Sequence, residues 1–287
     1  SPEDVPMTRL ALVVLACLAA GLSPAADCPE PCRWERVFGT HADEKAHAAA
    51  PHPDGGFLVV GNSRARNAVD YDAWVMRVTE GGVQGRMRGF GGRDAEQFHD
   101  IAVSPSGRFL AVGHTRSEGA GRSDVMAVLL GRDGEPLARR TFGGRQDERA
   151  HAVAALPDDG FALAGFTESE GAGQRDALVI RFSGAGEPLW QRRFGGEGSD
   201  AARDIIALAD GGLLVAGHRW SDEGAGFDIW LLRLDARGET LWERRIDTER
   251  FEAATALASL PDGDIAVAGT VGEIGRASCR ERVFPVV

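Results

Sequence analysis

A spacing of 52 residues runs through this chain and limits what it can fold into. One glycine and one arginine return in each unit at this spacing. They are Gly61, Gly113, Gly165, Gly217 and Gly269, and Arg36, Arg88, Arg140, Arg192 and Arg244. Self-similarity at a fixed period predicts a repeat architecture. The many glycines and turns exclude a helical solenoid, and a parallel β-helix would have a shorter period.

The third unit shows what one copy contains. Short apolar runs occupy residues 151–155, 161–166, 177–182 and 189–194, and turns rich in Gly, Pro and Asp separate them. Such runs are typical of four strands. A four-stranded sheet repeated along a chain is the blade of a β-propeller. The sequence therefore predicts an all-β fold, a β-propeller of four-stranded blades whose strands we call A to D from the centre outward.

Partial units are expected at both ends of the propeller, which we assign to residues 34–272. The chain should begin with a lone D strand, Arg33 to Phe38, and end after a B strand, Ile265 to Thr270. Four complete blades lie between them, so we expect an incomplete, C-terminally truncated ring. From Glu273 to Val283 the sequence EIGRASCRERV resembles the in-frame translation of a sequencing adapter, so residues 273–287 are interpreted as an artefactual tail.

The N-terminal segment, residues 1–26, is interpreted as a few upstream residues followed by a signal peptide. Met7 begins a charged, apolar and then small-residue order that predicts cleavage after Ala25 or Ala26. Its apolar run is too short to span a bilayer, so we expect no transmembrane segment. Lipidation at Cys17 is an alternative processing route. Residues 27–33 form a Cys/Pro linker in which Cys28 and Cys32 could close a small disulfide loop.

A family resemblance follows from these motifs. The unit reads W-x-R-x-F-G-G, an acid, D-G-G-F-x-x-x-G-x-T-x-S, D-A-x-x-x-R and G-E-x-L-W, and it resembles the secreted bacterial β-propeller repeats of the seven-bladed cell-surface type. The resemblance covers Trp34 to Gly269 and implies the fold and an exported protein, and it carries no catalytic residue across to this chain. Trp190 and Trp242 also resemble the tryptophan-docking repeat of quinone-dependent dehydrogenases, although Arg86 and Ala138 replace the tryptophan in earlier units.

Several polar residues recur once per unit, and we expect structural roles for them. Asp72, Asp124, Asp176 and Asp228 should accept hydrogen bonds from turn amides, and Glu44, Glu96, Glu148, Asp200 and Glu252 should cap the D-to-A loops. The D-strand arginines should discourage edge-to-edge pairing. His47, His99 and His151 share one position on strand A, where later units have Arg203 and Thr255. This row could bind a metal or an anion, but we expect hydrogen bonds within or between blades.

Residues that occur only once are better candidates for ligand binding. The B-to-C loop of the fourth unit contains His218, Arg219 and Trp220, and the first unit contains Tyr71, the single tyrosine. Trp and Arg are enriched at recognition hot spots. The D-to-A and B-to-C loops share one face of a propeller, which we call the long-loop face. We expect a protein or carbohydrate ligand there.

The chemistry of the chain favours binding over catalysis. A formal net charge of −11 argues against nucleic-acid binding. The sequence has no nucleophile elbow, phosphate loop or Cys/His metal spacing, so we predict no catalytic or metal-binding residue and no cofactor. The leading hypothesis is an exported, non-catalytic propeller, either periplasmic, at the cell surface or extracellular. A quinone-dependent dehydrogenase and a glycoside hydrolase or lyase are the alternatives.

Overall fold

A computed structural model describes residues 36–39, 43–65, 68–221, 226–246, 251–260, 263–273 and 276–286. Of residues 251, 271–273 and 276–286 it gives only the backbone. The described residues form five antiparallel sheets in sequence order. The predicted signal segment 1–26 with Cys17, and the linker 27–33 with Cys28 and Cys32, lie outside the described residues. The described part contains no helix long and apolar enough to cross a membrane.

Each of the first four sheets contains four strands. The first consists of β1 (Asp43–Pro51), β2 (Phe57–Arg64), β3 (Asp72–Val78) and β4 (Gln84–Phe90). The second consists of β5 (Glu96–Val103), β6 (Phe109–Thr115), β7 (Asp124–Leu130) and β8 (Pro136–Phe142). The third consists of β9 (Glu148–Ala155), β10 (Phe161–Thr167), β11 (Asp176–Phe182) and β12 (Pro188–Phe194). The fourth consists of β13 (Ala201–Ala207), β14 (Leu213–Ser221), β15 (Gly226–Leu234) and β16 (Thr240–Ile246).

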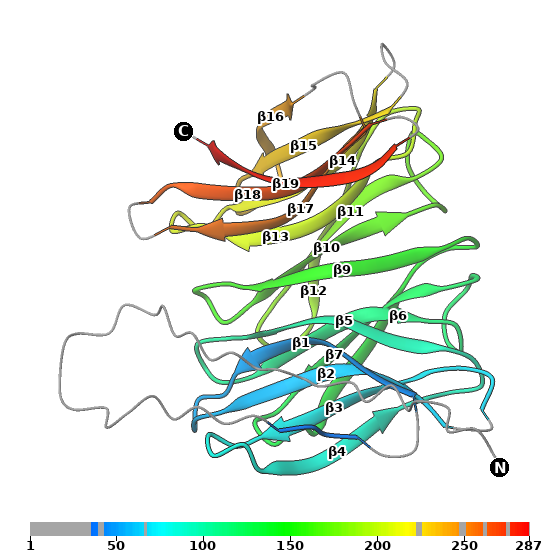
Figure 1. Ribbon diagram of the computed structural model, residues 1–287, viewed down its shortest axis with the longest axis vertical. Coiled ribbons are helices and arrows are strands. Elements are labelled where there is room, and N and C mark those ends of the chain that lie inside the picture. The colour runs from blue at the N-terminus through cyan, green and yellow to red at the C-terminus, as the bar shows by residue number, and fades with distance from the viewer. Residues whose placement is uncertain are drawn as a thin grey trace.

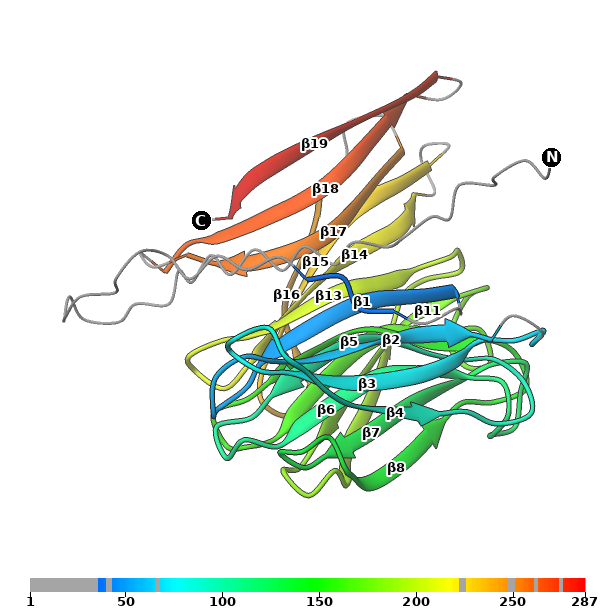
Figure 2. The ribbon, with the colours of Figure 1, turned by 60° about the horizontal axis from the view of Figure 1, so that its bottom comes forward.

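The fifth sheet has three strands, β17 (Phe251–Ser259), β18 (Ile265–Glu273) and β19 (Arg276–Val286). Neighbouring sheets meet through their first strands, so β1, β5, β9, β13 and β17 follow one another in space (Figure 1). We call this row of strands the inner wall. Figure 2 shows the strands of the first two sheets stepping outward from β1 and β5 to β4 and β8. The first and fifth sheets lie at opposite ends of the molecule, and the described residues form an open arc.

Apolar side chains fill the space between neighbouring sheets. Leu58 and Val75 of the first sheet pack with Phe98 and Phe109 of the second in one buried cluster, and similar clusters join the later sheets. The second and third strands of the inner sheets are buried on both faces, which explains why they are continuous apolar runs in the sequence. We call each boundary between two sheets a seam.

A β-bulge interrupts every first strand and explains the repeated glycine. In the third sheet, Ala150 pairs with Gly165 and Ala152 pairs with Ala164, so His151 has no partner residue. A Cβ atom on Gly165 would lie 1.9 Å from the carbonyl oxygen of Arg149, so only glycine fits opposite the bulge. Bulges re-aim side chains. Here the bulge re-aims the side chain of one residue in each first strand of the inner wall.

The ends of the arc differ from the sequence-based expectation. Residues 36–38 form no strand, so the predicted lone D strand, Arg33 to Phe38, is wrong for the residues that are described. Before β1, the described residues offer this segment no neighbouring C strand with which to pair.

The fifth unit does not stop after its second strand, because β19 pairs along β18. Val286 lies opposite Ile265, in the register that Leu234 and Leu213 have in the fourth sheet. The edge of β18 offers unpaired backbone groups to the following segment, and β19 occupies the place of strand C. Glu273 and residues 276–286 of this segment are therefore part of the fifth sheet, and the resemblance of the segment to an adapter stays a prediction.

Candidate functional site

The bulges place a row of histidines and an arginine along the inner wall. The ring centroids of His47 and His99 lie 6.2 Å apart, and those of His99 and His151 lie 5.9 Å apart with nearly parallel planes. Arg203 Nη1 is 3.3 Å from His151 Nε2. The predicted hydrogen bonds of this row are present, because His99 Nδ1 also lies 2.7 Å from the carbonyl oxygen of Ala150 in the next sheet.

The residue after each repeated glycine forms a second layer against this row. His114 on β6 lies 5.0 Å from His99, between ring centroids, and Phe166 on β10 lies 5.5 Å from His151. His218 occupies the same position on β14. Both His114 and His218 are buried, and their Nδ1 atoms have no hydrogen-bond partner within the described part of the chain.

Three guanidinium groups gather around these rings. Arg175 lies 4.1 Å above the Phe166 ring and forms an ion pair with Glu168 at 2.5 Å. Arg149 has a buried Nε atom without a partner among the described residues. Burial lowers the pKa of Arg203, and the charge of Arg175 lowers it further. We call this set the inner-wall cluster, and its members are His99, His114, His151, His218, Arg149, Arg175 and Arg203.

The imidazoles of the cluster are neutral at pH 7. Burial is the main cause, and neighbouring arginines add to it. The pKa falls to about 4 for His99, about 3 for His114, about 2 for His151 and about 4 for His218. His151 must accept the hydrogen bond from Arg203 through Nε2, and His99 must donate to Ala150 through Nδ1. The positive charge of the cluster therefore resides on its arginines.

Two half-buried carboxylates follow the bulges on β5 and β13. Asp100 accepts hydrogen bonds from the Val153 amide at 2.8 Å and from the Ile101 amide at 2.8 Å. Asp204 accepts from the Leu257 amide at 2.6 Å. Burial raises the pKa of Asp100 to about 6 and raises that of Asp204. These side chains link the first strands of neighbouring sheets.

The carboxylates that recur in every unit organise turns in the sheets where their contacts are described. Glu148 accepts from the Gly144 amide at 2.6 Å and from Thr167 Oγ1 at 2.9 Å, which joins the D-to-A loop to β10. Asp124 accepts from the Gly121 amide at 3.1 Å, and Asp176 accepts from the Gly173 amide at 3.1 Å. The predicted structural roles of these three residues are confirmed.

The D-strand arginines do more than protect an edge. Arg140 forms an ion pair with Glu187 at 2.5 Å, and Arg192 forms one with Glu239 at 3.4 Å. In both cases the glutamate belongs to the C-to-D turn of the next sheet. The outer strands are therefore tied across the seams, although exposed pairs of this kind contribute little stability each.

The structure brings together two of the sequence-predicted ligand residues, His218 and Trp220, which both pack on Phe227. His218, Arg219 and Trp220 lie on β14 and not in a loop, because β14 and β15 stay paired as far as Ser221 and Gly226. His218 belongs to the inner-wall cluster. Arg219 forms an ion pair with Glu243 of β16 at 2.6 Å.

The other two candidates lie in different sheets. Trp220 is 40% exposed and packs edge-on against Phe227 at 5.3 Å between ring centroids. Tyr71 directly precedes β3 of the first sheet and donates a hydrogen bond to Asp43 at 2.8 Å. Neither residue contributes a described contact to the inner-wall cluster.

Sequence reasoning missed Arg149, Arg175 and His114. The repeat positions of Arg149 and Arg175 hold other residues in every other unit, and that of His114 holds histidine again only at His218, so the period conceals them. In the sequence, Arg203 interrupts the histidine row, whereas in the structure it continues the row as a cation. A search for basic residues at repeat positions that vary between units would have found these members of the cluster.

Comparison with known protein families gives no match. The regulatory protein FlaEY of Caulobacter vibrioides is 27% identical over 134 residues, which are 41% of this chain and 14% of that protein. This chain thus spans a small part of that relative's length.

Two solved structures resemble the fold. A protein of unknown function from Bacteroides caccae is 14% identical, with 83% of this chain and 75% of that one covered and a TM-score of 0.50. A glucose dehydrogenase is 10% identical, with 84% of each chain covered and a TM-score of 0.50. The chain has a β-propeller-like fold. The predicted all-β architecture of repeated four-stranded blades is confirmed, and these similarities concern the fold alone.

Proposed function

We propose that this chain is an exported, non-catalytic binding protein whose inner wall binds an acidic glycan. The observation that carries the proposal is the inner-wall cluster, in which three half-buried guanidiniums lie among buried and half-buried neutral imidazoles. One carboxylate, Glu168, forms an ion pair with the cluster within the described residues. Arg149 and Arg203 have no carboxylate partner there. Half-buried cations without a counterion favour an anionic ligand.

The same cluster disfavours a metal ion. Neutral imidazoles are good metal ligands, and the row of histidines considered alone would suit one. The positive charges of Arg149, Arg175 and Arg203 repel a metal cation from the same space. The imidazoles therefore serve better as hydrogen-bonding groups than as metal ligands.

The chemistry of the cluster suits a sugar acid. A guanidinium binds a planar carboxylate through two parallel hydrogen bonds. A neutral imidazole both donates and accepts, which matches sugar hydroxyl groups. Arg203 supplies the first kind of contact, and His99 and His151 supply the second. A uronic acid combines both kinds of group in one ring.

The alternatives from the sequence have less support. The resemblance of the fold to a glucose dehydrogenase is compatible with a quinone-dependent enzyme, but it concerns the fold alone. For a glycoside hydrolase, Asp100 and Asp204 are half-buried carboxylates of the inner wall. Each is engaged by backbone amides of its own and the next strand, which supports a structural role.

The test compares acidic and neutral oligosaccharides by calorimetry on the full chain. We expect tetragalacturonate to bind and its neutral counterpart, tetragalactose, to bind at least about 10-fold more weakly, a difference of about 1.4 kcal/mol. Arg203→Gln should cost about 1.5 to 3 kcal/mol of binding free energy, the range for a hydrogen bond to a charged group.

The matched control is Arg192→Gln, which removes an arginine from the outer strand β12. It should bind like the unmodified protein. Equal affinity for the acidic and neutral sugars, or no effect of Arg203→Gln, would show that the inner wall does not bind acidic glycans.

A further inference from the structure

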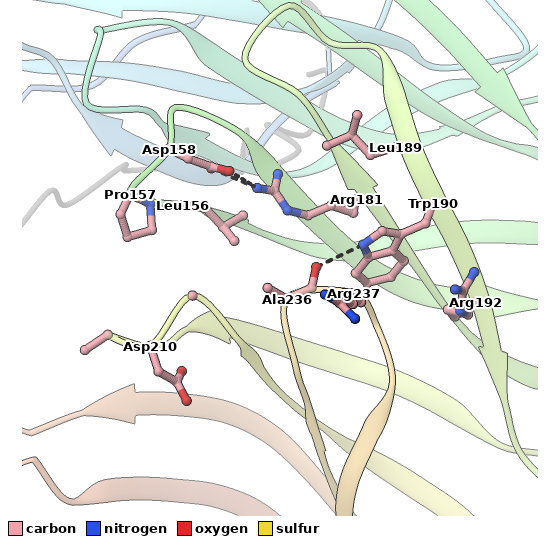
Figure 3. Close-up of a pocket in the computed structure, with 12 residues that line it drawn as sticks. Leu156, Pro157, Asp158, Arg181, Leu189, Trp190, Arg192, Asp210, Ala236 and Arg237 are labelled. Carbon is pink, nitrogen blue, oxygen red and sulfur yellow. Dashed lines mark hydrogen bonds and ion pairs between the residues drawn. The ribbon is translucent and has the colours of Figure 1, made fainter.

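A groove of about 670 Å³ opens at the seam between the third and fourth sheets, on the face opposite the long loops. The turns after β9 and β13 form one side, and β12 with the turn after β15 forms the other. Figure 3 shows Asp158 and Leu156 facing this space from one side and Trp190 and Arg237 from the other (Figure 3). Its volume lies in the range of small-molecule sites.

Direct hydrogen bonds between turns cross the two earlier seams. At the first seam, His52 Nε2 donates to the carbonyl oxygen of Arg132 at 2.9 Å. At the second seam, Arg108 Nη1 donates to the carbonyl oxygen of Gly184 at 2.9 Å. These contacts tie an A-to-B turn to the C-to-D turn of the next sheet.

The third seam lacks the residues that make these contacts. Leu156 stands at the repeat position of His52, and Gly160 stands at that of Arg108. An apolar side chain and a glycine cannot donate these side-chain hydrogen bonds. The groove is therefore a specific consequence of substitutions in the third unit.

An indole ring is held in a fixed position at this groove. Trp190 Nε1 donates to the carbonyl oxygen of Ala236 at 3.2 Å. A Cβ atom on Gly238 would lie 3.0 Å from the ring, so the turn after β15 supports the indole closely. Leu189, which is 59% exposed, adds apolar surface beside it. A rigid aromatic anchor loses little entropy when it binds a ligand.

The charges around the groove are nearly balanced. Asp158 is paired with Arg181 at 2.6 Å, and Asp210 is paired with Arg233. Both carboxylates are largely exposed and keep lone pairs for further hydrogen bonds. The exposed guanidinium of Arg237 has no side-chain partner within the described residues. Acceptors, one unpaired donor group and an aromatic surface suit an uncharged ring rich in hydroxyl groups.

We propose that this groove is a second binding site and that it takes a neutral sugar. The C–H face of the ring packs on the apolar wall of Trp190 and Leu189. Its hydroxyl groups donate to Asp158 and Asp210 and accept from Arg237. The site is separate from the inner-wall cluster and does not depend on the acidic-glycan proposal.

The experiment is calorimetric titration of the full chain with cellotetraose, xylotetraose and chitotetraose. We expect at least one of them to bind at low-millimolar concentration or better. Trp190→Ala should weaken that binding at least 10-fold. Arg237→Gln, which changes an exposed side chain, should weaken it several-fold without altering the unfolding transition.

Two control variants separate this site from other surfaces. Trp242→Ala removes the tryptophan at the same repeat position on β16 and should bind normally. Arg203→Gln should also bind neutral sugar normally, so a failure of the acidic-glycan proposal leaves this result intact. Absence of binding by all three sugars, or unchanged affinity in Trp190→Ala or Arg237→Gln, would overturn the proposal.

Discussion

Replacing Gly165 with alanine should damage both the fold and the inner wall. The new Cβ atom would lie 1.9 Å from the Arg149 carbonyl oxygen, which is well inside any allowed contact. The obstacle is backbone and cannot rotate away, so β9 and β10 must separate or the bulge at His151 must be lost. Overpacking in a well-packed interior costs about 1 to 3 kcal/mol, and we expect the upper end of this range.

Urea unfolding followed by circular dichroism measures this cost. A loss of about 3 kcal/mol should also lower the melting temperature by roughly 6 to 12 °C for a domain of this size. The control is Gly89→Ala on β4, where a Cβ atom meets nothing within 4 Å. That variant should stay within about 0.5 kcal/mol of the unmodified protein. Equal stability of Gly165→Ala and Gly89→Ala would refute the explanation of the repeated glycine.

Three further predictions concern charge. The free energy of unfolding should fall as the pH drops from about 6.5 toward 4, because the unfolded chain binds protons that the native imidazoles exclude. The loss should be up to about 1.4 kcal/mol per pH unit for each cluster imidazole. Asp100, with its pKa raised to about 6, takes up a proton in the native state before it does so in the unfolded chain, which offsets part of this loss. A flat pH–stability profile in urea titrations would contradict the lowered pKa values of the imidazoles. Arg181→Ala should lower the free energy of unfolding by about 3 kcal/mol, because the buried guanidinium donates to the carbonyl oxygens of Phe161 and Phe182. A loss below about 1 kcal/mol in urea unfolding would show that these carbonyls find other donors. Raising the salt concentration from about 50 to 500 mM should weaken tetragalacturonate binding, and salt-independent affinity would argue against ionic recognition.

The repeat predicted most of the fold because it fixes strand order and blade size together. Each unit contains four apolar runs, and the structure forms a strand at each of them in the complete units. The ends were harder, because pairing at an edge depends on which backbone groups lie nearby. The segment after Glu273 shows little of the repeat pattern, yet it extends along the edge of β18.

The candidate site was largely hidden from the sequence. Arg149 and Arg175 are 26 residues apart and come together with Arg203 only when the third and fourth sheets pack side by side. The bulge also cannot be detected in the sequence without the strand register, although the repeated glycine indicates its position. Trp220 is unusual in sequence, and in the structure it packs on Phe227, which also contacts His218 of the cluster.

The central claim is that an anionic ligand binds beside the imidazoles of the inner wall. Nuclear magnetic resonance of the imidazole nitrogens, recorded during titration with tetragalacturonate, tests it most directly. We predict shifts at His99, His151 and His218, and a rise in their pKa values on binding, because the ligand's negative charge offsets the neighbouring arginines. His52, which lies in a turn beside Arg132, should not change. Binding without any change at the three cluster histidines would place the ligand elsewhere and contradict the account.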